Sequence, residues 1–109
     1  MQSEGVIQSE CMIALSKAGC TVWRNNTGVL VDKNGRPVKF GLCVGSSDLI
    51  GICADGRFLA VECKSATGKA TDAQLRFIAA VNARGGRAGV ARSAAEAVAI
   101  ATSPAVPHP

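Results

Sequence analysis

The chain has 109 residues, of which 48% are hydrophobic and 18% are charged, and its net charge is +4 at pH 7. This length and apolar content predict one folded domain with its own core and exclude an intrinsically disordered chain. No apolar stretch approaches the ~20 residues of a membrane-spanning helix, and the N-terminus lacks the pattern of a secretion signal, so we expect a cytosolic protein without a membrane partner.

The five cysteines and the single histidine form no zinc-binding pattern. There is no Cys-x-x-Cys pair, and His108 lies in a proline-rich tail. We therefore expect free, mostly buried thiols and no zinc. The basic net charge is compatible with a polyanionic partner, but the few aromatic residues do not predict a stacking platform for single-stranded bases.

A first helix is predicted over residues 3–18, with Ser3 as its N-cap. Four apolar residues recur at helical spacing and form one stripe: Ile7, Cys11, Leu15 and Ala18. Glu4 falls at the centre of this stripe, so we expect its carboxylate to point inward, whereas Glu10 falls on the flank. An acid at a helix N-terminus also complements the helix dipole, and for Glu4 that alternative stays open.

A short strand is predicted over residues 20–24, and a polar cluster follows it at residues 24–28. Asn and Gly are typical of turns, so the cluster is interpreted either as a simple turn or as a polar loop beside a functional site. In the second interpretation Arg24 or Asn25 contacts phosphate.

A hairpin is predicted over residues 29–40, where two apolar runs flank Asn34-Gly35. Pro37 cannot donate a hydrogen bond to a strand ladder, so its strand should lie at an edge. The hairpin carries three basic residues: Lys33, Arg36 and Lys39. They form either a solvated face or a finger that contacts DNA.

A central hairpin is predicted where two further apolar runs flank Ala54-Asp55-Gly56. A loop of two residues places Asp48 opposite Cys63. A loop of three residues, with Gly56 in the left-handed conformation, places Asp48 opposite Glu62. We predict the three-residue loop, because glycine adopts positive φ without a steric penalty.

Two opposed carboxylates on this hairpin predict a site for a divalent cation. Residues directly opposite on antiparallel strands have Cβ atoms about 4.5–5.5 Å apart, so the carboxylates of Asp48 and Glu62 repel each other there. An ion such as Mg²⁺, which prefers carboxylate oxygens, removes the repulsion. Lys64 shares a face with Glu62, because side chains alternate along a strand. A solvated charged face is the alternative.

A second helix is predicted to begin after Thr71, which forms a capping-box pattern with Gln74. Gln74 also lies on the apolar side of this helix, so it either serves only as a cap or reaches the functional site. The polar loop before the helix, residues 65–70, contains Lys69.

A strand over residues 87–92 and a helix capped by Ser93 complete the predicted elements. The passage from the strand ending at Lys64 through the second helix to this strand predicts a right-handed crossover between parallel strands. We therefore expect one α/β domain over residues 1–102, with a mixed sheet flanked by helices, and a flexible tail over residues 103–109.

Taken together, these residues resemble the PD-(D/E)xK nuclease superfamily, in which one strand begins with Asp and the next carries (D/E)-x-K. The closer resemblance is to the VRR-NUC family, the virus-type replication–repair nuclease domain, over about residues 3–95. The matching pieces are Ser3-Glu4 with Gln8, Arg24-Asn25-Asn26-Thr27-Gly28, Gly45-Ser46-Ser47-Asp48-Leu49-Ile50-Gly51, Glu62-Cys63-Lys64, and Thr71 with Gln74. The superfamily's Pro before the Asp is Ser47 here, and a Pro at that position would shape the backbone rather than bind metal.

The resemblance implies a restriction-endonuclease-like core, in the order α-β-β-β-α-β, with an extra β-hairpin. It implies a DNA endonuclease that depends on Mg²⁺ or Mn²⁺. The implied metal ligands are Asp48, Glu62, the backbone carbonyl of Cys63, and Glu4. Lys64 is the implied catalytic lysine, and Gln74 is a further implied catalytic residue.

DNA contacts are expected from Arg24, Asn25, Lys33, Arg36, Lys39 and Lys69. The resemblance also implies a homodimer that cuts a branched substrate, such as a four-way (Holliday) junction, on two strands during DNA repair. Such a protein would act on DNA in the cytoplasm of a bacterial or phage-infected cell. The alternatives are a nicking or flap nuclease and a non-catalytic DNA-binding subunit that retains the fold.

Overall fold

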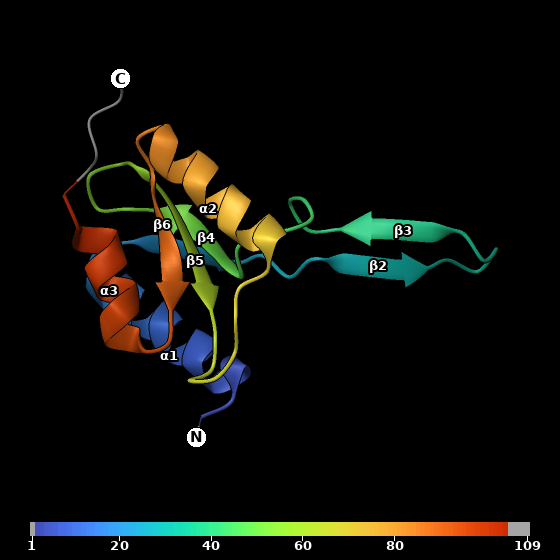
Figure 1. Cartoon of the computed structure of the whole chain (residues 1–109), viewed down its shortest axis with the longest axis horizontal. Coiled ribbons are helices and arrows are strands. Elements are labelled where there is room, and N and C mark those ends of the chain that lie inside the picture. Colours follow the sequence, from blue (N-terminus) through green and yellow to red (C-terminus); the bar gives the residue numbers. More distant parts are fainter. Residues whose placement is uncertain (1, 105–109) are drawn as a thin grey trace.

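The computed structural model describes residues 2–104. The elements are α1 (Glu4–Lys17), β1 (Thr21–Arg24), β2 (Gly28–Val31), β3 (Pro37–Phe40), β4 (Leu49–Ile52), β5 (Phe58–Cys63), α2 (Asp72–Ala83), β6 (Arg87–Ala91) and α3 (Ala94–Thr102). Four strands form one sheet in the order β1-β4-β5-β6, and β2 and β3 form a separate hairpin (Figure 1). The predicted α/β architecture with an extra hairpin is confirmed.

The main sheet is mixed. β1 pairs with β4 and β4 with β5 in antiparallel fashion, whereas β5 and β6 are parallel. α2 connects the two parallel strands, as the predicted crossover requires. The sheet therefore ends in two different edges, β1 and β6.

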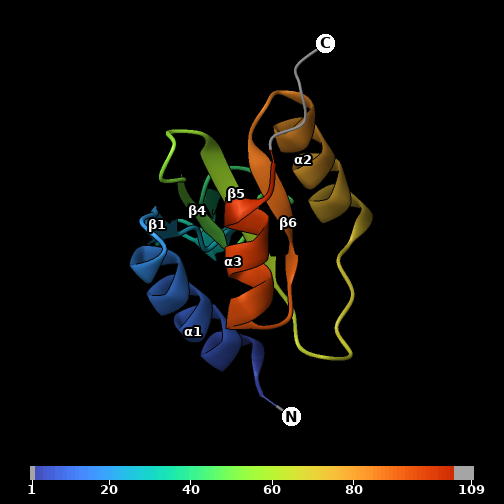
Figure 2. The same ribbon diagram turned by 90° about the vertical axis from the view of Figure 1, so that its left-hand side faces the viewer.

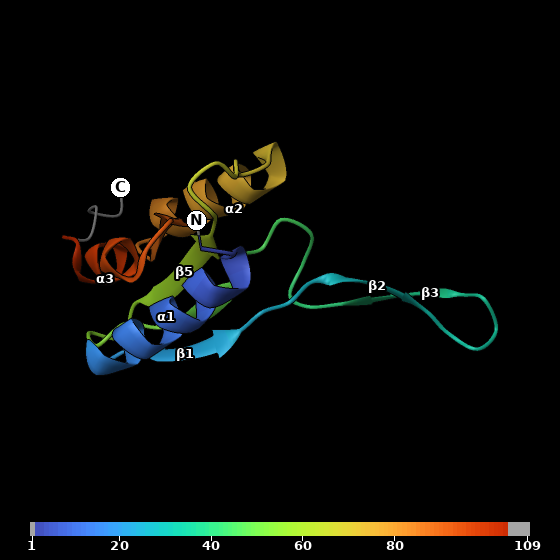
Figure 3. The same cartoon turned by 90° about the horizontal axis from the view of Figure 1, so that it is seen from below.

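The core lies between the sheet and the pair α1 and α3, which pack side by side (Figure 2). The alternate residues of β5 that face these helices are fully buried: Leu59, Val61 and Cys63. They meet the predicted apolar stripe of α1, of which three members are buried, Ile7, Cys11 and Leu15, and Ala18 is half-buried. α2 lies on the opposite side of β5 from α1 (Figure 3). One face of the sheet is thus closed by two helices, and the other is only partly covered by α2.

Each helix begins at a side-chain cap. Ser3 Oγ accepts a hydrogen bond from the Val6 N–H at 3.3 Å, and Ser93 Oγ accepts one from the Glu96 N–H at 3.2 Å. Thr71 caps α2 by a full capping box with Gln74. All three caps were predicted from the sequence.

The central hairpin has the three-residue loop that the sequence predicts. The Cys53 N–H donates to the Arg57 carbonyl at 2.8 Å, and Gly56 has a φ of 90°. Leu49 of β4 pairs with Val61 of β5. Continued by one residue, this register sets Asp48 opposite Glu62.

The hairpin of β2 and β3, residues 28–40, projects from the body of the molecule, and we call it the arm (Figures 1 and 3). Its tip is closed by Asp32, whose Oδ1 accepts from the N–H groups of Asn34 at 2.8 Å and Arg36 at 2.9 Å. Pro37 begins β3, and both strands of a two-stranded ribbon are edges, as Pro37 requires.

All five cysteines are free thiols; four are buried and Cys43 is exposed. The predicted tail is partly described: the Ser103 carbonyl accepts a hydrogen bond from Arg87 Nε at 2.7 Å, and residues 105–109 lie outside the described residues. Within residues 2–104 no helix has the length and apolar character needed to cross a membrane.

Candidate active site

Asp48 and Glu62 meet where β4 begins and β5 ends. Asp48 Oδ2 accepts a hydrogen bond from the Cys63 N–H at 3.0 Å, which fixes the carboxylate against β5. Glu62 is only 2% exposed, although it carries an ionisable group. The turn between the two strands therefore brings one partly exposed and one buried carboxylate together, as predicted.

The two oxygens of Glu62 have different surroundings. Oε1 accepts a hydrogen bond from Gln74 Nε2 at 3.2 Å and lies 3.9 Å from Lys64 Nζ. Oε2 is buried and has no hydrogen-bond partner among residues 2–104. A buried carboxylate oxygen without a donor is costly, so this atom marks a place for a positive ligand.

The pKa of Glu62 is raised to about 8. Burial is the largest cause, followed by the neighbouring carboxylate of Asp48, while the charge of Lys64 acts in the opposite direction. Both causes disfavour a second negative charge at this point. A pair of carboxylates in this arrangement either shares a proton or shares a cation.

Lys64 follows Glu62 by two residues and has the same orientation along the strand. Its side chain is 13% exposed. An ammonium group held this way next to an acidic pair remains close to any ligand of that pair. The predicted Glu-x-Lys geometry is therefore present.

Gln74 both caps α2 and contacts the candidate site. Its Oε1 accepts from the Thr71 N–H at 2.8 Å, which completes the cap, and its Nε2 donates to Glu62. The first turn of α2 is thereby joined to the buried carboxylate. Gln74 orients Glu62 Oε1 and leaves Oε2 free.

The donor set fits a divalent cation. Asp48 and Glu62 supply carboxylate oxygens, one of which, Glu62 Oε2, is buried and has no partner among the described residues. Hard cations such as Mg²⁺ and Mn²⁺ prefer oxygen ligands of this type. A divalent cation would give the buried Glu62 Oε2 a partner, and a proton shared with Asp48 is the other arrangement open to this pair.

Comparison with known proteins agrees with this geometry. The family model of the VRR-NUC domain matches residues 2–95. This chain belongs to the VRR-NUC family. A solved structure described as a VRR_NUC domain is similar, with a TM-score of 0.62, 22% sequence identity, and coverage of 94% of this chain and 100% of that chain. At that identity the likeness shows the fold alone. Among curated proteins no match is found.

The VRR-NUC fold is a nuclease-type fold, and not every residue expected at its site is brought there. Glu4 was expected to point inward, but it is exposed at the first turn of α1. A Cβ built on Gly68 would lie 3.3 Å from Glu4 Oε2 and 3.5 Å from Lys64 Cδ, so the Glu4 carboxylate lies at the loop after β5. The Glu4 carboxylate thus lies near the Lys64 side chain, although Glu4 itself is exposed.

Glu4 therefore acts on the VRR-NUC site by charge rather than as part of a tight cluster. Its carboxylate raises the pKa of Glu62, but only as the smallest of the causes. Within residues 2–104 no group of three Asp, Glu, His or Cys side chains is close enough to hold one ion. The expectation that Glu4 is a direct ligand beside Asp48 and Glu62 is not supported by this arrangement.

Asn25 is a second correction, because it is buried and cannot contact phosphate in this conformation. Its Nδ2 donates to Ser46 Oγ at 2.8 Å and to the Ser47 carbonyl at 2.9 Å, and its Oδ1 accepts from the Leu42 N–H at 3.0 Å. Its own N–H donates to the Asp48 carbonyl at 2.7 Å. Asn25 thus anchors the loop before β4 and positions Asp48.

Arg24 is held by α1. Its guanidinium donates to Gln8 Oε1 and, at 3.0 Å, to Ser9 Oγ. This contact joins the end of β1 to the first helix and leaves Arg24 exposed. A phosphate contact by Arg24 remains compatible with this position.

The remaining residues that were predicted to contact DNA are exposed and lie on two segments. Three are exposed on the arm: Lys33, Arg36 and Lys39. Lys69 is exposed on the loop between β5 and α2.

One positioning residue of the VRR-NUC site was missed in the sequence. Arg92 Nη1 donates to the carbonyls of Ser65 at 2.5 Å and Gly68 at 2.6 Å. It therefore fastens the loop that follows Lys64. An arginine after a strand carries no sequence signal for such a contact with two distant carbonyls.

Proposed function

We propose that this VRR-NUC domain is a metal-dependent DNA endonuclease that hydrolyses phosphodiester bonds. The single observation that carries the proposal is the pairing of partly exposed Asp48 with buried Glu62, whose Oε2 has no partner among the described residues. A purely structural strand end has no reason to bury such a group.

Asp48 and Glu62 would hold Mg²⁺ or Mn²⁺, with the backbone carbonyl of Cys63 as a further oxygen ligand. The ion supplies charge for the scissile phosphate and a water of lowered pKa. Asp48 is oriented by the Cys63 N–H, and Glu62 is oriented by Gln74. These contacts fix the direction in which the two carboxylates present their remaining oxygens.

Lys64 has one of two roles at its Nζ atom. As an ammonium group it stabilises negative charge on the phosphate, and as a neutral amine it accepts a proton from the attacking water. The pH–rate profile of Lys64→Arg separates them. An unchanged profile with substantial activity excludes the base role, and loss of activity at every pH supports it.

The proposed substrate is DNA of defined structure rather than defined sequence. The basic residues available to it, Arg24, Lys69 and the cations of the arm, are exposed and suited to sequence-independent backbone contacts. We extend the proposal to a homodimer that cuts the two strands of a four-way junction, because two sites related by a two-fold axis match such a substrate.

The alternatives are a nicking or flap nuclease and a non-catalytic DNA-binding subunit. The first shares the same site and differs in the DNA structure that is cut. The second is disfavoured, because Asp48, Glu62, Lys64 and Gln74 are all present, and Lys64 and Gln74 both contact Glu62.

The proposal is tested by cleavage of a labelled four-way junction, a 5′ flap and plain duplex with Mg²⁺ or Mn²⁺. Wild type should cut in the presence of either ion and stop with a chelator, and Glu62→Gln should lower the rate about 10³-fold or more. The control is Glu10→Gln. The Glu10 carboxylate lies on α1 and accepts a hydrogen bond from Gln2. Equal rates for wild type and Glu62→Gln would refute a nuclease function.

A further inference from the structure

Two cysteines lie opposite each other at one end of the main sheet. Thr21 of β1 pairs with Ile52 of β4, so the next pair along the same antiparallel register is Cys20 and Cys53. Residues directly opposite on neighbouring strands direct their side chains to the same face of the sheet. Both thiols are accordingly part of the buried core, and the two residues are 8% and 3% exposed.

The ladder between β1 and β4 shows which kind of pair this is. Along an antiparallel ladder, hydrogen-bonded pairs alternate with closer, non-hydrogen-bonded pairs. Asn25 and Asp48 form a hydrogen-bonded pair, because the Asn25 N–H donates to the Asp48 carbonyl at 2.7 Å. Cys20 and Cys53 lie five positions further along (25 to 20 and 48 to 53), and an odd number of steps makes them a non-hydrogen-bonded pair.

The backbone amides of the two cysteines agree with this assignment. The Cys20 N–H donates to the Leu15 carbonyl at 3.0 Å, and the Cys53 N–H donates to the Arg57 carbonyl at 2.8 Å. Neither amide is therefore used across the pair. The Cα atoms of a non-hydrogen-bonded pair are about 4.5 Å apart. A disulfide requires Cα atoms roughly 4.4–6.8 Å apart, so the two strands are already spaced for one.

The segments that carry the two cysteines are packed together. A Cβ built on Gly19 would lie 3.3 Å from Ala54 Cβ. Burial is the largest cause that raises the pKa of the Cys20 thiol, and the charge of a Cys53 thiolate is the second. Each sulfur is thus close enough to be affected by a charge on the other.

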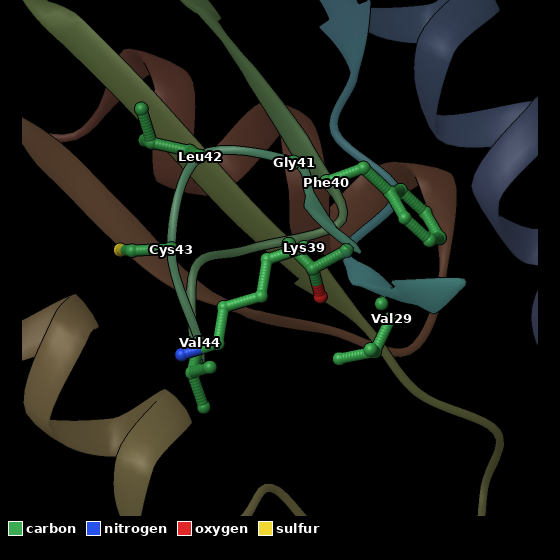
Figure 4. Close-up of a pocket in the computed structure, with 10 residues that line it drawn as sticks. Val29, Lys39, Phe40, Gly41, Leu42, Cys43 and Val44 are labelled. Atoms are coloured by element: carbon green, nitrogen blue, oxygen red, sulfur yellow. The ribbon is translucent and has the colours of Figure 1, made fainter. Parts of the chain in front are cut away.

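Cys43 is not a partner for either thiol. It is exposed on the loop over residues 41–45, beside an apolar hollow at the base of the arm (Figure 4). The Cys43 carbonyl accepts from Ser46 Oγ, which also accepts from Asn25 Nδ2, so Cys43 lies at the Asn25 end of β1. Cys20 lies at the other end of this strand, roughly 15 Å away, which is too far for a disulfide.

The remaining two cysteines are closed to a reagent in solution. Cys11 and Cys63 are both 0% exposed, between α1 and β5. Cys11 Sγ donates to the Ser93 carbonyl at 3.5 Å. Cys20, at 8%, keeps a small accessible edge. Because access governs which thiol is oxidised, the reaction should begin at Cys20 rather than in the centre of the core.

We propose that Cys20 and Cys53 form an oxidisable dithiol, which a low-molecular-weight disulfide such as oxidised glutathione converts into a disulfide between β1 and β4. The Cys20 thiol loses its proton to water, and the thiolate attacks one sulfur of the reagent and releases one glutathione thiolate. The Cys53 thiolate then attacks the Cys20 sulfur of the mixed disulfide and releases the second glutathione. Two protein thiols are oxidised, one reagent disulfide is reduced to two thiols, and the two glutathione thiolates take up the two protons.

The disulfide closes a ring over residues 20–53, which contains β1, the arm and Asp48. β1 is an edge strand, and among the described strands it pairs with β4. One end of this pairing is fixed by the bond from the Asn25 N–H, and the disulfide fixes the other end. It therefore restrains local opening of the edge and limits the freedom of the unfolded chain. This inference does not depend on the proposed nuclease function.

The test is oxidation of folded, full-length Cys43→Ser protein by oxidised glutathione, without denaturant. This variant lacks the exposed thiol that would form disulfides between molecules, and it retains Cys11 and Cys63 as an internal control. Trypsin should release residues 18–24 joined to residues 40–57, and reduction should separate the two peptides. The Tm of the oxidised protein should be higher by about 10 °C.

Cys20→Ser in the same background is the matched control, and oxidised glutathione should leave its Tm unchanged. Far-UV circular dichroism checks that this variant is folded, and Cys53→Ser repeats the measurement from the other strand. Four free thiols after oxidation, or a link between residues 1–17 and 58–64, would overturn the proposal. So would a glutathione adduct on Cys20 that does not proceed to the disulfide, or a disulfide that lowers the Tm, since either shows that the strands are not spaced for the bond.

Discussion

Two adjacent serines before Asp48 have opposite environments. Ser46 Oγ donates to the Cys43 carbonyl at 2.6 Å and accepts from Asn25 Nδ2 at 2.8 Å. Ser47 Oγ is buried and has no hydrogen-bond partner in the described part of the chain.

The two serines should therefore respond differently to loss of the hydroxyl. Ser46→Ala leaves buried partners unpaired and should lower the free energy of unfolding by about 1–3 kcal/mol. Ser47→Ala removes an unpaired hydroxyl and should raise the free energy of unfolding by about 0 to 1 kcal/mol. Urea unfolding of both variants checks this, and an equal loss in the two would show that Ser47 has a partner.

Asn25 is predicted to act on the reaction through Asp48. Asn25→Asp keeps the acceptor for Leu42 and removes the Nδ2 donor to Ser46 and to the Ser47 carbonyl. Loss of such a supporting contact should lower kcat by roughly 10–100-fold with a smaller effect on KM.

Asn26→Asp is the matched control for that variant, because Asn26 is exposed and the charge change is the same. Steady-state cleavage of a flap or junction substrate measures both variants. If they lose activity equally, or if the loss at Asn25 is entirely in KM, Asn25 contacts DNA and does not position Asp48.

At the scale of elements, the loop between β4 and β5 is tied to β6 by Arg87. Its Nη1 and Nη2 donate to Asp55 Oδ1 and Oδ2 at 2.7 and 2.8 Å, so the pair is bidentate. These hydrogen bonds are the main cause that lowers the pKa of Asp55 to about 2. The contact helps hold the far ends of three strands together.

The sign of the resulting pH dependence follows from that lowered pKa. The pKa of Asp in an unfolded chain is about 3.9. The Arg87–Asp55 pair therefore stabilises the fold above that pH, and this stabilisation is lost as the pH falls towards 2. The Tm difference between wild type and Asp55→Asn should be constant from pH 5 to 8 and shrink below pH 4. Because Asp55 is half exposed, added salt should reduce the difference. A difference that persists at pH 2 would contradict the assignment.

The elements could be predicted largely because local signals agree with the fold. Ser3, Thr71 and Ser93 begin helices as capping rules require, and Gly56 fixes the three-residue loop. That loop decides the register, and the register brings Asp48 to Glu62. The central pair of the site was therefore readable from the sequence.

What could not be predicted depends on distant partners. Asn25 resembles a turn residue in the sequence, and only the fold shows that the loop before β4 closes over it. Arg92 and Gly68 are 24 residues apart, and their contact leaves no periodic signal. Glu4 is exposed rather than buried, because helical periodicity gives a direction but not what covers a residue in that direction.

At the scale of the whole molecule, the chain divides into a closed body and an unsupported arm. The sequence predicted the hairpin over residues 29–40 and suggested DNA contact through its three basic residues. It could not show that the hairpin leaves the main sheet, because a continuous apolar run such as Val29–Val31 fits a covered strand equally well. The exposed apolar residues, rather than the cations, distinguish the arm.

The central claim is that the body is organised around a cation site made by Asp48 and Glu62. The most direct measurement is Mn²⁺ binding without DNA, by isothermal titration calorimetry on wild type, Glu62→Gln and the Glu10→Gln control. Wild type and the control should bind Mn²⁺ with the same saturable affinity, and Glu62→Gln should lose that binding at least tenfold with its Tm preserved. Equal Mn²⁺ binding by wild type and Glu62→Gln would contradict the account.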